Sequence, residues 1–522
     1  MRHTARPFVA SLHLLIAAAA SAAGGWPQWR GPGRDAVVTG GPAVVPWGAD
    51  GPALLWQSDP IPGTKSSGYG SVVESEGRLY LYASWSFADP VDTRTLKDDA
   101  LKDLGWTSDT FPADKVAQVE AARASDERRK LTQAQVNDWA DGWLKGQWPD
   151  EKDRNLLAFA RDRLVRGGRA IELDALARIG AARGRVFPDE AAWQQWLGGQ
   201  NLPEPVRKEV DKVVTRTHDY TKDTIVCVDA ATGRTVWKTV FDIGAVHQWG
   251  SSSTACVADG RVLAMGSTGL AYGLKADDGA ELWKAELGKG AESSSFLVRD
   301  GVAYVQTSRG AFALDPATGA VKWTQEKTAS NACSPVWMDA GGTPTLLCNT
   351  AAHVYGLDPK TGEVRWSAPG GLYCTPAVSG DRVVLMTEKN GLVCYAVAGG
   401  KAEQAWKIDA RDRGTSPVIR DGRVYVTPGG EALCADLESG RLLWRKKIAG
   451  GEIASPVWVD GKLLAPFDAG KTVALLQPGD ADCEVLAKAR LEIAHCGIPC
   501  VAGGTYYARK DDGIYAYRLS AP

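Results

Sequence analysis

Residues 314–323 read LDPATGAVKW, and this stretch decides the fold because close copies of it recur along the chain. Residues 228–237 read VDAATGRTVW, residues 357–366 read LDPKTGEVRW and residues 435–444 read ADLESGRLLW. Each copy has an aspartate, a turn that ends in glycine, and a tryptophan four residues after that glycine. The chain is therefore built from a repeat.

The repeats are evenly spaced and end in tryptophan. Weaker copies end at Trp283 and Trp406, and successive tryptophans lie 38 to 46 residues apart. A period of about 40 to 45 residues, built from short strands and tight turns, is typical of a β-propeller with one four-stranded blade per repeat. In the turn, aspartate accepts backbone N–H bonds, glycine adopts a positive φ, and tryptophan packs between blades. We interpret the tryptophans as structural docking residues: Trp56, Trp237, Trp283, Trp323, Trp366, Trp406 and Trp444.

The repeats add up to eight blades. Six end in tryptophan, a degenerate one spans 455–489, and the last three strands span 497–519. The final repeat lacks an outer strand, whereas GPALLWQSD at 51–59 is an outer strand without a repeat of its own. Joining the two closes the ring and removes exposed sheet edges. The sequence predicts an all-β fold, an eight-bladed β-propeller of four-stranded antiparallel blades over 24–85 and 221–522, closed by an N-terminal strand.

Residues 86–220 interrupt the first blade and have another composition. Charged side chains make up 46 of these 135 residues, a denser load than in the rest of the chain. Thr132 and Gln135 have the spacing of a helix capping box, and Leu156, Phe159 and Leu164 form an apolar stripe at helical spacing. The sequence therefore predicts a charged α-helical insertion over 86–220.

The N-terminus has the layout of an export signal. Arg2 and Arg6 precede an apolar stretch over 8–20, and small residues follow up to position 23. We expect 1–23 to be a cleaved signal peptide and the mature protein to be periplasmic or secreted. No cysteine lies near the cleavage point, so we expect no lipid anchor, and no other apolar stretch approaches the ~18 residues that span a bilayer.

Charge and cysteine content narrow the function classes. Lys and Arg number 60 against 62 Asp and Glu, so the chain lacks the basic field that holds a nucleic acid. All ten cysteines lie between Cys227 and Cys500, and Cys227 and Cys434 occupy a small core position of the repeat. We assign these two to packing and leave any disulfide connectivity open.

A ring of small residues precedes the inner strands when the blades are aligned. Small side chains are expected where eight strands crowd one axis. Cys333 and Cys374, on neighbouring blades, are candidates for metal or redox chemistry, and crowding at the axis is the alternative. The ring consists of Gly70, Ser253, Ser294, Cys333, Cys374, Thr415, Ala454 and Gly497.

Two residues before this ring, polar side chains mark the mouth of the channel. Arg413, Glu452 and His495 fall on consecutive blades, and a carboxylate between a guanidinium and an imidazole can bind a polar ligand or move a proton. A solvated ion-pair cluster on the rim is the alternative. Glu292 and Asn331 are oxygen ligands of the kind that Ca²⁺ takes, but two ligands fall short of six to eight.

Aromatic and basic residues lie on the same face of the predicted propeller. His247 and Trp249 lie in one loop, and Lys65 and Tyr69 lie in another. Such groups around a concave mouth suit a ligand or a partner segment, and they equally suit loop packing.

The repeats resemble a known family. The Asp-x-x-Thr-Gly-x-x-x-Trp copies, the Ser-Pro-x-x-x-Asp-Gly openings and WPQWRGP at 26–32 resemble proteins with PQQ-like β-propeller repeats. That superfamily includes quinoprotein alcohol dehydrogenases and the outer-membrane-protein assembly lipoprotein of the BAM machinery. The resemblance implies the fold and, for the dehydrogenases, PQQ with Ca²⁺. This sequence lacks their adjacent cysteine pair, a Cys-x-x-Cys-His haem site, and the lipidated cysteine of the assembly lipoprotein.

The sequence favours an exported, non-catalytic scaffold that binds a protein or glycan partner. The alternative is a quinoprotein-like oxidoreductase that binds PQQ at the channel mouth, with Arg413, Glu452 and His495 as contacts. The residues leave the ligand, the oligomeric state and the role of the insertion open.

Overall fold

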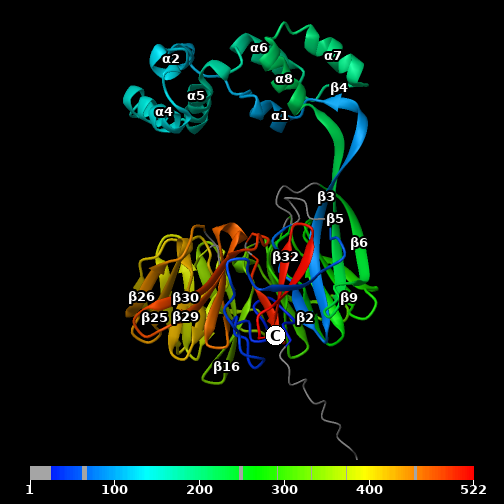
Figure 1. The fold of residues 1–522 in the computed structure, drawn as a ribbon, viewed down its shortest axis with the longest axis vertical. Coiled ribbons are helices and arrows are strands. Elements are labelled where there is room, and N and C mark those ends of the chain that lie inside the picture. The colour runs from blue at the N-terminus through cyan, green and yellow to red at the C-terminus, as the bar shows by residue number, and fades with distance from the viewer. Residues whose placement is uncertain are drawn as a thin grey trace, which may run out of the picture. The chain divides into compact units, whose positions relative to one another are not determined.

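The computed structural model describes residues 25–61, 68–245, 251–290, 292–330, 332–371, 373–451, 455–495 and 497–521. The predicted signal peptide, 1–23, lies outside the described residues. The chain divides into two compact units (Figure 1). One comprises Met1–Ser86 with Tyr220–Pro522, and the other comprises Phe87–Asp219.

The strands of the first unit form eight sheets within the described residues, which confirms the predicted eight-bladed propeller. Figure 1 shows the sheets side by side, and the inner strand of the last blade, β31 (Cys500–Ala502), contacts that of the first, β2 (Val73–Ser75). Blade 1 consists of β2 (Val73–Ser75), β3 (Arg78–Thr95), β5 (Thr215–Asp229) and β6 (Thr235–Ala245). Blade 2 consists of β7 (Cys256–Ala258), β8 (Arg261–Met265), β9 (Leu270–Lys275) and β10 (Glu281–Glu286). Blade 3 consists of β11 (Leu297–Arg299), β12 (Val302–Thr307), β13 (Gly310–Leu314) and β14 (Val321–Gln325).

The next blades keep the same inner-to-outer strand order. Blade 4 consists of β15 (Val336–Ala340), β16 (Thr343–Asn349), β17 (His353–Leu357) and β18 (Val364–Pro369). Blade 5 consists of β19 (Ala377–Ser379), β20 (Arg382–Thr387), β21 (Gly391–Ala398) and β22 (Lys401–Ile408). Blade 6 consists of β23 (Val418–Arg420), β24 (Arg423–Val426), β25 (Glu431–Asp436) and β26 (Leu442–Lys447). Blade 7 consists of β27 (Val457–Val459), β28 (Lys462–Phe467), β29 (Thr472–Pro478) and β30 (Cys483–Arg490), with the short helix η4 (Asp468–Gly470) before β29.

The N-terminal strand closes the ring as predicted. Blade 8 consists of β31 (Cys500–Ala502), β32 (Thr505–Lys510) and β33 (Gly513–Arg518), and β1 (Ala53–Gln57) pairs antiparallel with β33 as its outer strand. Ala53 lies opposite Arg518, and Gln57 lies opposite Tyr515. The first and last parts of the chain thus share one sheet.

The repeated turn and its tryptophan join each blade to the next. Asp315 Oδ1 accepts hydrogen bonds from the backbone N–H groups of Ala317 (2.8 Å) and Thr318 (3.2 Å). The indole Nε1 of Trp323 donates to Pro359 O in blade 4 at 3.0 Å. A Cβ at Gly362 would lie 2.6 Å from the Trp323 ring, and φ at Gly362 is 75°, so both packing and backbone conformation require glycine.

Four other tryptophans make the same contact with the turn of the following blade. Their indole Nε1 atoms donate as follows: Trp237 to Ala276 O (2.9 Å), Trp283 to Pro316 O (2.9 Å), Trp406 to Leu437 O (2.7 Å) and Trp444 to Gly479 O (3.0 Å).

Within a blade, a small residue lies opposite the tryptophan on the neighbouring strand. Cys227 and Cys434 pair across the sheet with Trp237 and Trp444, which confirms their assignment to a small core position. Trp366 is 6% exposed and faces Gly356 in the same way.

Hydroxyl groups link most of the neighbouring inner strands. The backbone N–H of Thr254 donates to Ser295 Oγ, and that of Ser295 donates to Ser334 Oγ, both at 2.9 Å. These residues directly follow the predicted ring of small residues, which explains the recurrent serine or threonine at the start of a repeat. The same link joins Ser71 to Thr254 (2.9 Å), Thr375 to Ser416 (3.0 Å), Ser416 to Ser455 (3.0 Å) and Ile498 to Ser71 (3.0 Å).

The segment before β1 runs among the inner strands. Its backbone pairs with β2 at Glu74 and with β27 at Trp458. Arg30 is fully buried and donates to Pro417 O, and Arg34 is 2% exposed and donates to Pro335 O (2.6 Å) and Ser295 O (2.9 Å). Two guanidinium groups thus fill the interior by binding carbonyl groups of several blades, a role that the sequence analysis missed.

The second unit is helical, as predicted for the insertion. The Thr132 backbone N–H donates to Gln135 Oε1 at 3.0 Å in the predicted capping box. Phe87–Asp219 also contains β4 (Val186–Phe187), which pairs with β3, and its apolar residues form two buried clusters. Its helices are α1 (Asp98–Asp103), α2 (Ala113–Arg123), α3 (Asp126–Arg129), α4 (Gln133–Gln147), α5 (Arg154–Arg166), α6 (Leu173–Ala181), α7 (Glu190–Gly198) and α8 (Glu204–Val213). In the described part of the chain, no helix has both the length and the apolar character to span a membrane.

Candidate functional site

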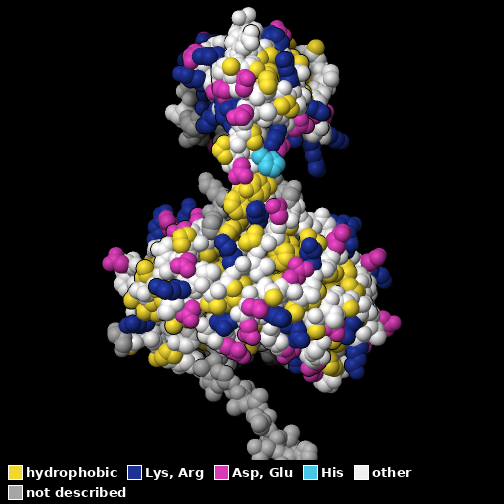
Figure 2. Space-filling model, turned by 90° about the vertical axis from the view of Figure 1, so that its right-hand side faces the viewer, with side chains coloured by type: hydrophobic (Ala, Val, Ile, Leu, Met, Phe, Trp, Pro, Cys, Tyr) yellow, Lys and Arg dark blue, Asp and Glu magenta, His cyan; other side chains and the backbone are white. Residues whose placement is uncertain are grey.

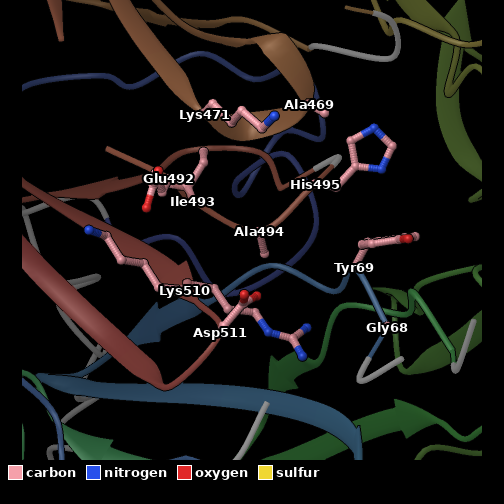
Figure 3. Close-up of a pocket in the computed structure, with 11 residues that line it drawn as sticks. Gly68, Tyr69, Ala469, Lys471, Glu492, Ile493, Ala494, His495, Lys510 and Asp511 are labelled. Atoms are coloured by element: carbon pink, nitrogen blue, oxygen red, sulfur yellow. The ribbon is translucent and has the colours of Figure 1, made fainter. Parts of the chain in front are cut away.

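A cavity of about 340 Å³ lies at the junction of blades 7, 8 and 1 (Figure 3). Blade 7 supplies residues around η4, the segment between β30 and β31 supplies a second wall, and the end of β32 with the turn after it supplies a third. The segment before β2 completes the lining. The lining residues are Gly68, Tyr69, Ala469, Lys471, Glu492, Ile493, Ala494, His495, Arg509, Lys510 and Asp511.

Two of the sequence-predicted residues, Tyr69 and His495, meet in this cavity. Their rings are edge to face, with centroids 5.1 Å apart, and Figure 3 shows them together on one wall. The Tyr69 backbone N–H donates to Ser252 Oγ at 3.2 Å, which anchors this wall to blade 2. The wall therefore offers aromatic surface next to a polar imidazole.

Arg509 is the buried cation of the cavity. Its side chain is 7% exposed, Nη1 donates to Gly70 O at 2.9 Å, and its backbone O accepts from the Ala494 N–H at 2.8 Å. Burial lowers the pKa of Arg509 to about 10. The guanidinium is fixed in position, and burial weakens its hydration.

Lys510 lies next to Arg509 along the chain and is also partly buried. Its Nζ lies 4.4 Å from the centroid of the Tyr515 ring and 5.7 Å from that of Tyr517. Burial lowers the pKa of Lys510. With Lys471, which is exposed, the cavity has three cationic side chains.

The two carboxylates of the lining are exposed to solvent. Glu492 pairs with Arg490 Nη2 at 2.6 Å, and this hydrogen-bonded partner lowers the pKa of Glu492. Arg490 does not line the cavity, so the charge of Glu492 is balanced in part from outside. Asp511 is exposed in the turn after β32. The lining is therefore positive overall.

A second cavity, of about 500 Å³, lies between blades 5 and 6. It contains the sequence-predicted Arg413, and its charges balance because three cations face three carboxylates. Asp412 Oδ1 accepts from the N–H groups of Gly414 and Thr415, both at 2.8 Å, so this carboxylate holds a turn. The lining residues are Glu388, Lys389, Gly391, Asp409, Ala410, Arg411, Asp412 and Arg413.

Glu292 is fully buried and bound within its own blade. Its carboxylate accepts from Ser308 Oγ (2.5 Å) and from the N–H groups of Ser308 (3.0 Å) and Lys289 (3.2 Å). Burial raises the pKa of Glu292, although the hydrogen bonds from Ser308 oppose the change. The described residues around Glu292 do not fit a Ca²⁺ site, because both of its oxygens already hold a turn and calcium takes six to eight oxygen ligands. Over the described ranges, no group of three or more His, Cys, Asp or Glu side chains is arranged to hold a metal ion.

Cys333 and Cys374 are fully buried. Burial raises the pKa of both thiols to about 12, and the Met386 backbone N–H donates to Cys374 Sγ at 3.2 Å. Thiols in such surroundings stay protonated and act as small apolar side chains.

The structure separates the predicted channel-mouth residues. Arg413 lines the cavity between blades 5 and 6, whereas His495 lines the cavity between blades 7, 8 and 1. Arg509 and Lys510 were missed because charged residues at the end of a strand look like ordinary surface residues in sequence. Five of the predicted ligand-binding residues, Lys65, His247, Trp249, Asn331 and Glu452, lie outside the described residues.

A protein-family model matches about half of the chain. Residues 221–371 and 369–484 match the family model described as outer membrane protein assembly factor BamB. The BamB of Yersinia pestis is 29% identical over 239 residues, which cover 44% of this chain and 53% of that protein. The BamB of Moranella endobia is 24% identical over 274 residues, which cover 50% of this chain and 63% of that protein. The chain thus matches between about half and two thirds of the length of these curated relatives.

Among solved structures, BamB from Moraxella catarrhalis aligns with a TM-score of 0.45 and 19% sequence identity. The alignment covers 56% of this chain and 87% of that chain.

Proposed function

The chain belongs to the outer membrane protein assembly factor BamB family of PQQ-like β-propellers, and on this basis we propose that it binds partner proteins as a non-catalytic scaffold. The proposal includes export, which the layout of 1–23 supports. A family name gives no activity by itself, because one fold serves many functions. The surface of this chain supplies the physical support.

The observation that carries the proposal is the placement of exposed apolar side chains on the outer strands. Outer strands are sheet edges, whose backbone groups and side chains are available to another chain. Exposed apolar side chains on such edges are available for contact with protein. The apolar side chains concerned are between 37% and 54% exposed: Leu54 and Leu55 on β1, Val236 and Val240 on β6, Leu282 on β10, Val321 on β14, Leu442 on β26 and Val485 on β30.

Figure 2 shows the same feature on the side of the propeller that carries β6 and β9. Hydrophobic side chains lie there among Lys, Arg, Asp and Glu side chains. A surface on which hydrophobic and charged side chains alternate is more typical of a protein–protein interface with a polar rim than of a pocket for one small ligand.

Site-specific crosslinking tests the scaffold function. A photo-crosslinking amino acid replaces Val236 or Leu442 in the full chain, and a matched control replaces Ser379, an exposed residue at the end of the inner strand β19. We expect discrete protein adducts from both outer-strand positions and none from the control.

Two results would overturn the scaffold proposal. The first is the same adduct pattern at all three positions. The second is no adduct at all together with turnover of an alcohol or sugar. If the adducts contain glycan instead of protein, the partner of the scaffold is a glycan and not a protein.

A further inference from the structure

We propose that the cavity lined by Tyr69, Lys471, His495 and Lys510 binds a carboxylate side chain on an extended segment of a partner protein. This inference rests on the proposed scaffold function and assigns the chemistry of one contact. The cavity and the apolar outer strands are built from different residues, so each can be changed alone.

The charge of the cavity selects an anion. Lys471, Arg509 and Lys510 line it together with His495, and Arg509 is held in place by the carbonyl group of Gly70. An anion that enters interacts with three fixed or nearby cations at once, in surroundings that water screens only in part.

The carboxylates of the lining do not cancel this charge. Glu492 is exposed and pairs with Arg490, which lies outside the lining, and Asp511 is exposed. The rings of Tyr515 and Tyr517 also face Lys510, and the carboxylates of Glu492 and Asp512 act on it as nearby negative charges. Asp512 lies outside the lining and accepts from the Tyr515 hydroxyl. Three cations against two carboxylates leave the lining with a net positive charge, which attracts an incoming carboxylate.

The size and the aromatic wall favour a peptide side chain over a free inorganic anion. A volume of about 340 Å³ is near the lower end of the ~300 to 1,000 Å³ range of ligand pockets, so it admits one or two side chains. The edge-to-face pair of Tyr69 and His495 offers packing surface that an inorganic anion leaves unused. A segment with an acidic residue beside an apolar one uses both features.

The backbone that forms the cavity is already in place. Ala469 and Glu492 have φ values of 56° and 53°, which non-glycine residues seldom adopt and which persist only where neighbours hold them. The Ile493 N–H donates to Gly470 O at 2.8 Å, and the Leu491 N–H donates to Lys471 O at 2.9 Å. Binding therefore requires little ordering of the backbone.

Calorimetric titration of the full chain with two capped tetrapeptides tests the inference. The probes are acetyl-Ala-Glu-Phe-Ala-amide and the matched peptide with Gln in place of Glu. We expect the Glu peptide to bind, the Gln peptide to bind about tenfold more weakly, and the affinity of the Glu peptide to fall as salt rises. Inorganic phosphate is titrated separately and as a competitor.

Matched variants locate the binding. Lys471→Gln and Lys510→Gln should each weaken binding of the Glu peptide several-fold, whereas Lys389→Gln, in the charge-balanced cavity, should leave it unchanged. Circular dichroism confirms that each variant is folded. Equal affinity for the two peptides would overturn the inference. So would lysine variants that bind as the wild type does, or binding of phosphate alone without binding of the peptide.

The outcome is distinguishable from that of the scaffold test. Crosslinks at Val236 or Leu442 that persist in a chain unable to bind the peptide would leave the scaffold function standing and remove the cavity's role. Peptide binding without any crosslinked partner would leave the anion-binding cavity standing and remove the support for the scaffold function.

Discussion

The indole ring of Trp56 packs directly on Gly233. Trp56 lies on β1, the closing strand of blade 8, and Gly233 lies in the turn between β5 and β6 of blade 1. A Cβ at Gly233 would lie 2.6 Å from the Trp56 ring. This contact repeats, at the closure of the ring, the tryptophan-to-turn contact found between the other blades.

Replacing Gly233 by alanine should destabilise the propeller through this contact. The φ of 75° at Gly233 costs an alanine about 1 to 2 kcal/mol, and overpacking against Trp56 adds about 1 to 3 kcal/mol. Gly461→Ala is the matched control, because its φ is 73° and nothing lies within 4 Å of the added Cβ. Urea unfolding measures both, and equal losses of stability would show that the Trp56 contact contributes nothing.

Glu120 should hold the helices of the second unit together in a pH-dependent way. Glu120 accepts from Arg163, whose side chain is 1% exposed, and from Arg123. Burial opposes ionisation, but the hydrogen bonds from both arginines prevail and lower the pKa of Glu120 below its usual value of 4.5. A carboxyl group with a lowered folded-state pKa stabilises the fold above its unfolded pKa, and this stability is lost as pH falls through the folded pKa.

Glu120→Gln should therefore lower stability at neutral pH by about 3 kcal/mol, because Arg163 is left buried without its anion. The difference from the wild type should shrink in acid below the usual glutamate pKa of 4.5. Thermal unfolding followed by far-UV circular dichroism at several pH values measures this. Glu204→Gln, at an exposed pair with Arg207, should change little at any pH. A Glu120 effect of the same size in acid and at neutral pH would contradict the ionic explanation.

Arg34 should be essential for the packing of the N-terminal segment. Arg34→Met removes the donors to Ser295, Phe296 and Pro335 and leaves buried carbonyl groups without them, at a cost of about 3 kcal/mol. Arg309→Met, at an exposed pair with Glu286, is the control and should cost little. Urea unfolding compares the two variants, and indistinguishable midpoints would show that the buried guanidinium is dispensable.

Addition of PQQ with Ca²⁺ should leave the absorbance spectrum of the protein unchanged. Glu292, the described carboxylate that was considered as a calcium ligand, already holds the turn at Ser308 with both of its oxygens. The measurement is the absorbance spectrum of the purified chain with PQQ and Ca²⁺, together with dye reduction by alcohols or sugars. A shifted spectrum with dye reduction would favour the quinoprotein-like oxidoreductase instead.

Export should remove the leader. Expression of the full sequence in a bacterial host, followed by intact-mass measurement, should give a chain that begins after residue 23, since the leader ends in small residues. A chain that keeps residues 1–23 in the cytoplasm would contradict this expectation.

The fold was predictable from the sequence because local turn chemistry and long-range packing coincide in the repeat. Asp315, Gly319 and Trp323 specify one turn and one interblade contact, and the spacing of their copies sets the number of blades. The closing strand was predictable because Trp56 lies in a strand that has no repeat of its own.

The candidate site was predictable only in part. His495 was found because aligning the blades places it in one row with Arg413 and Glu452, and Tyr69 was found as an aromatic residue in a loop on the same face. Arg509 and Lys510 are the last two residues of β32, and they line one cavity with Lys471 because blades 7 and 8 are neighbours, a relationship that no local pattern encodes. Arg30 and Arg34 were missed for a related reason. Their partners are backbone carbonyl groups, which every residue has, so no side-chain pattern in the sequence marks them.

The order of synthesis makes ring closure a late event in the maturation of this propeller. The segment that contains Trp26, Arg30 and β1 leaves the ribosome before the blades, yet Val45 bonds to Leu519 and β1 pairs with β33, which are made after the other seven blades. Contacts between such distant positions form slowly, because a long loop must close before they are made. Until then the nascent ring has an open seam between its first and last sheets, so a chain truncated near its C-terminus should expose that seam to aggregation or to proteases.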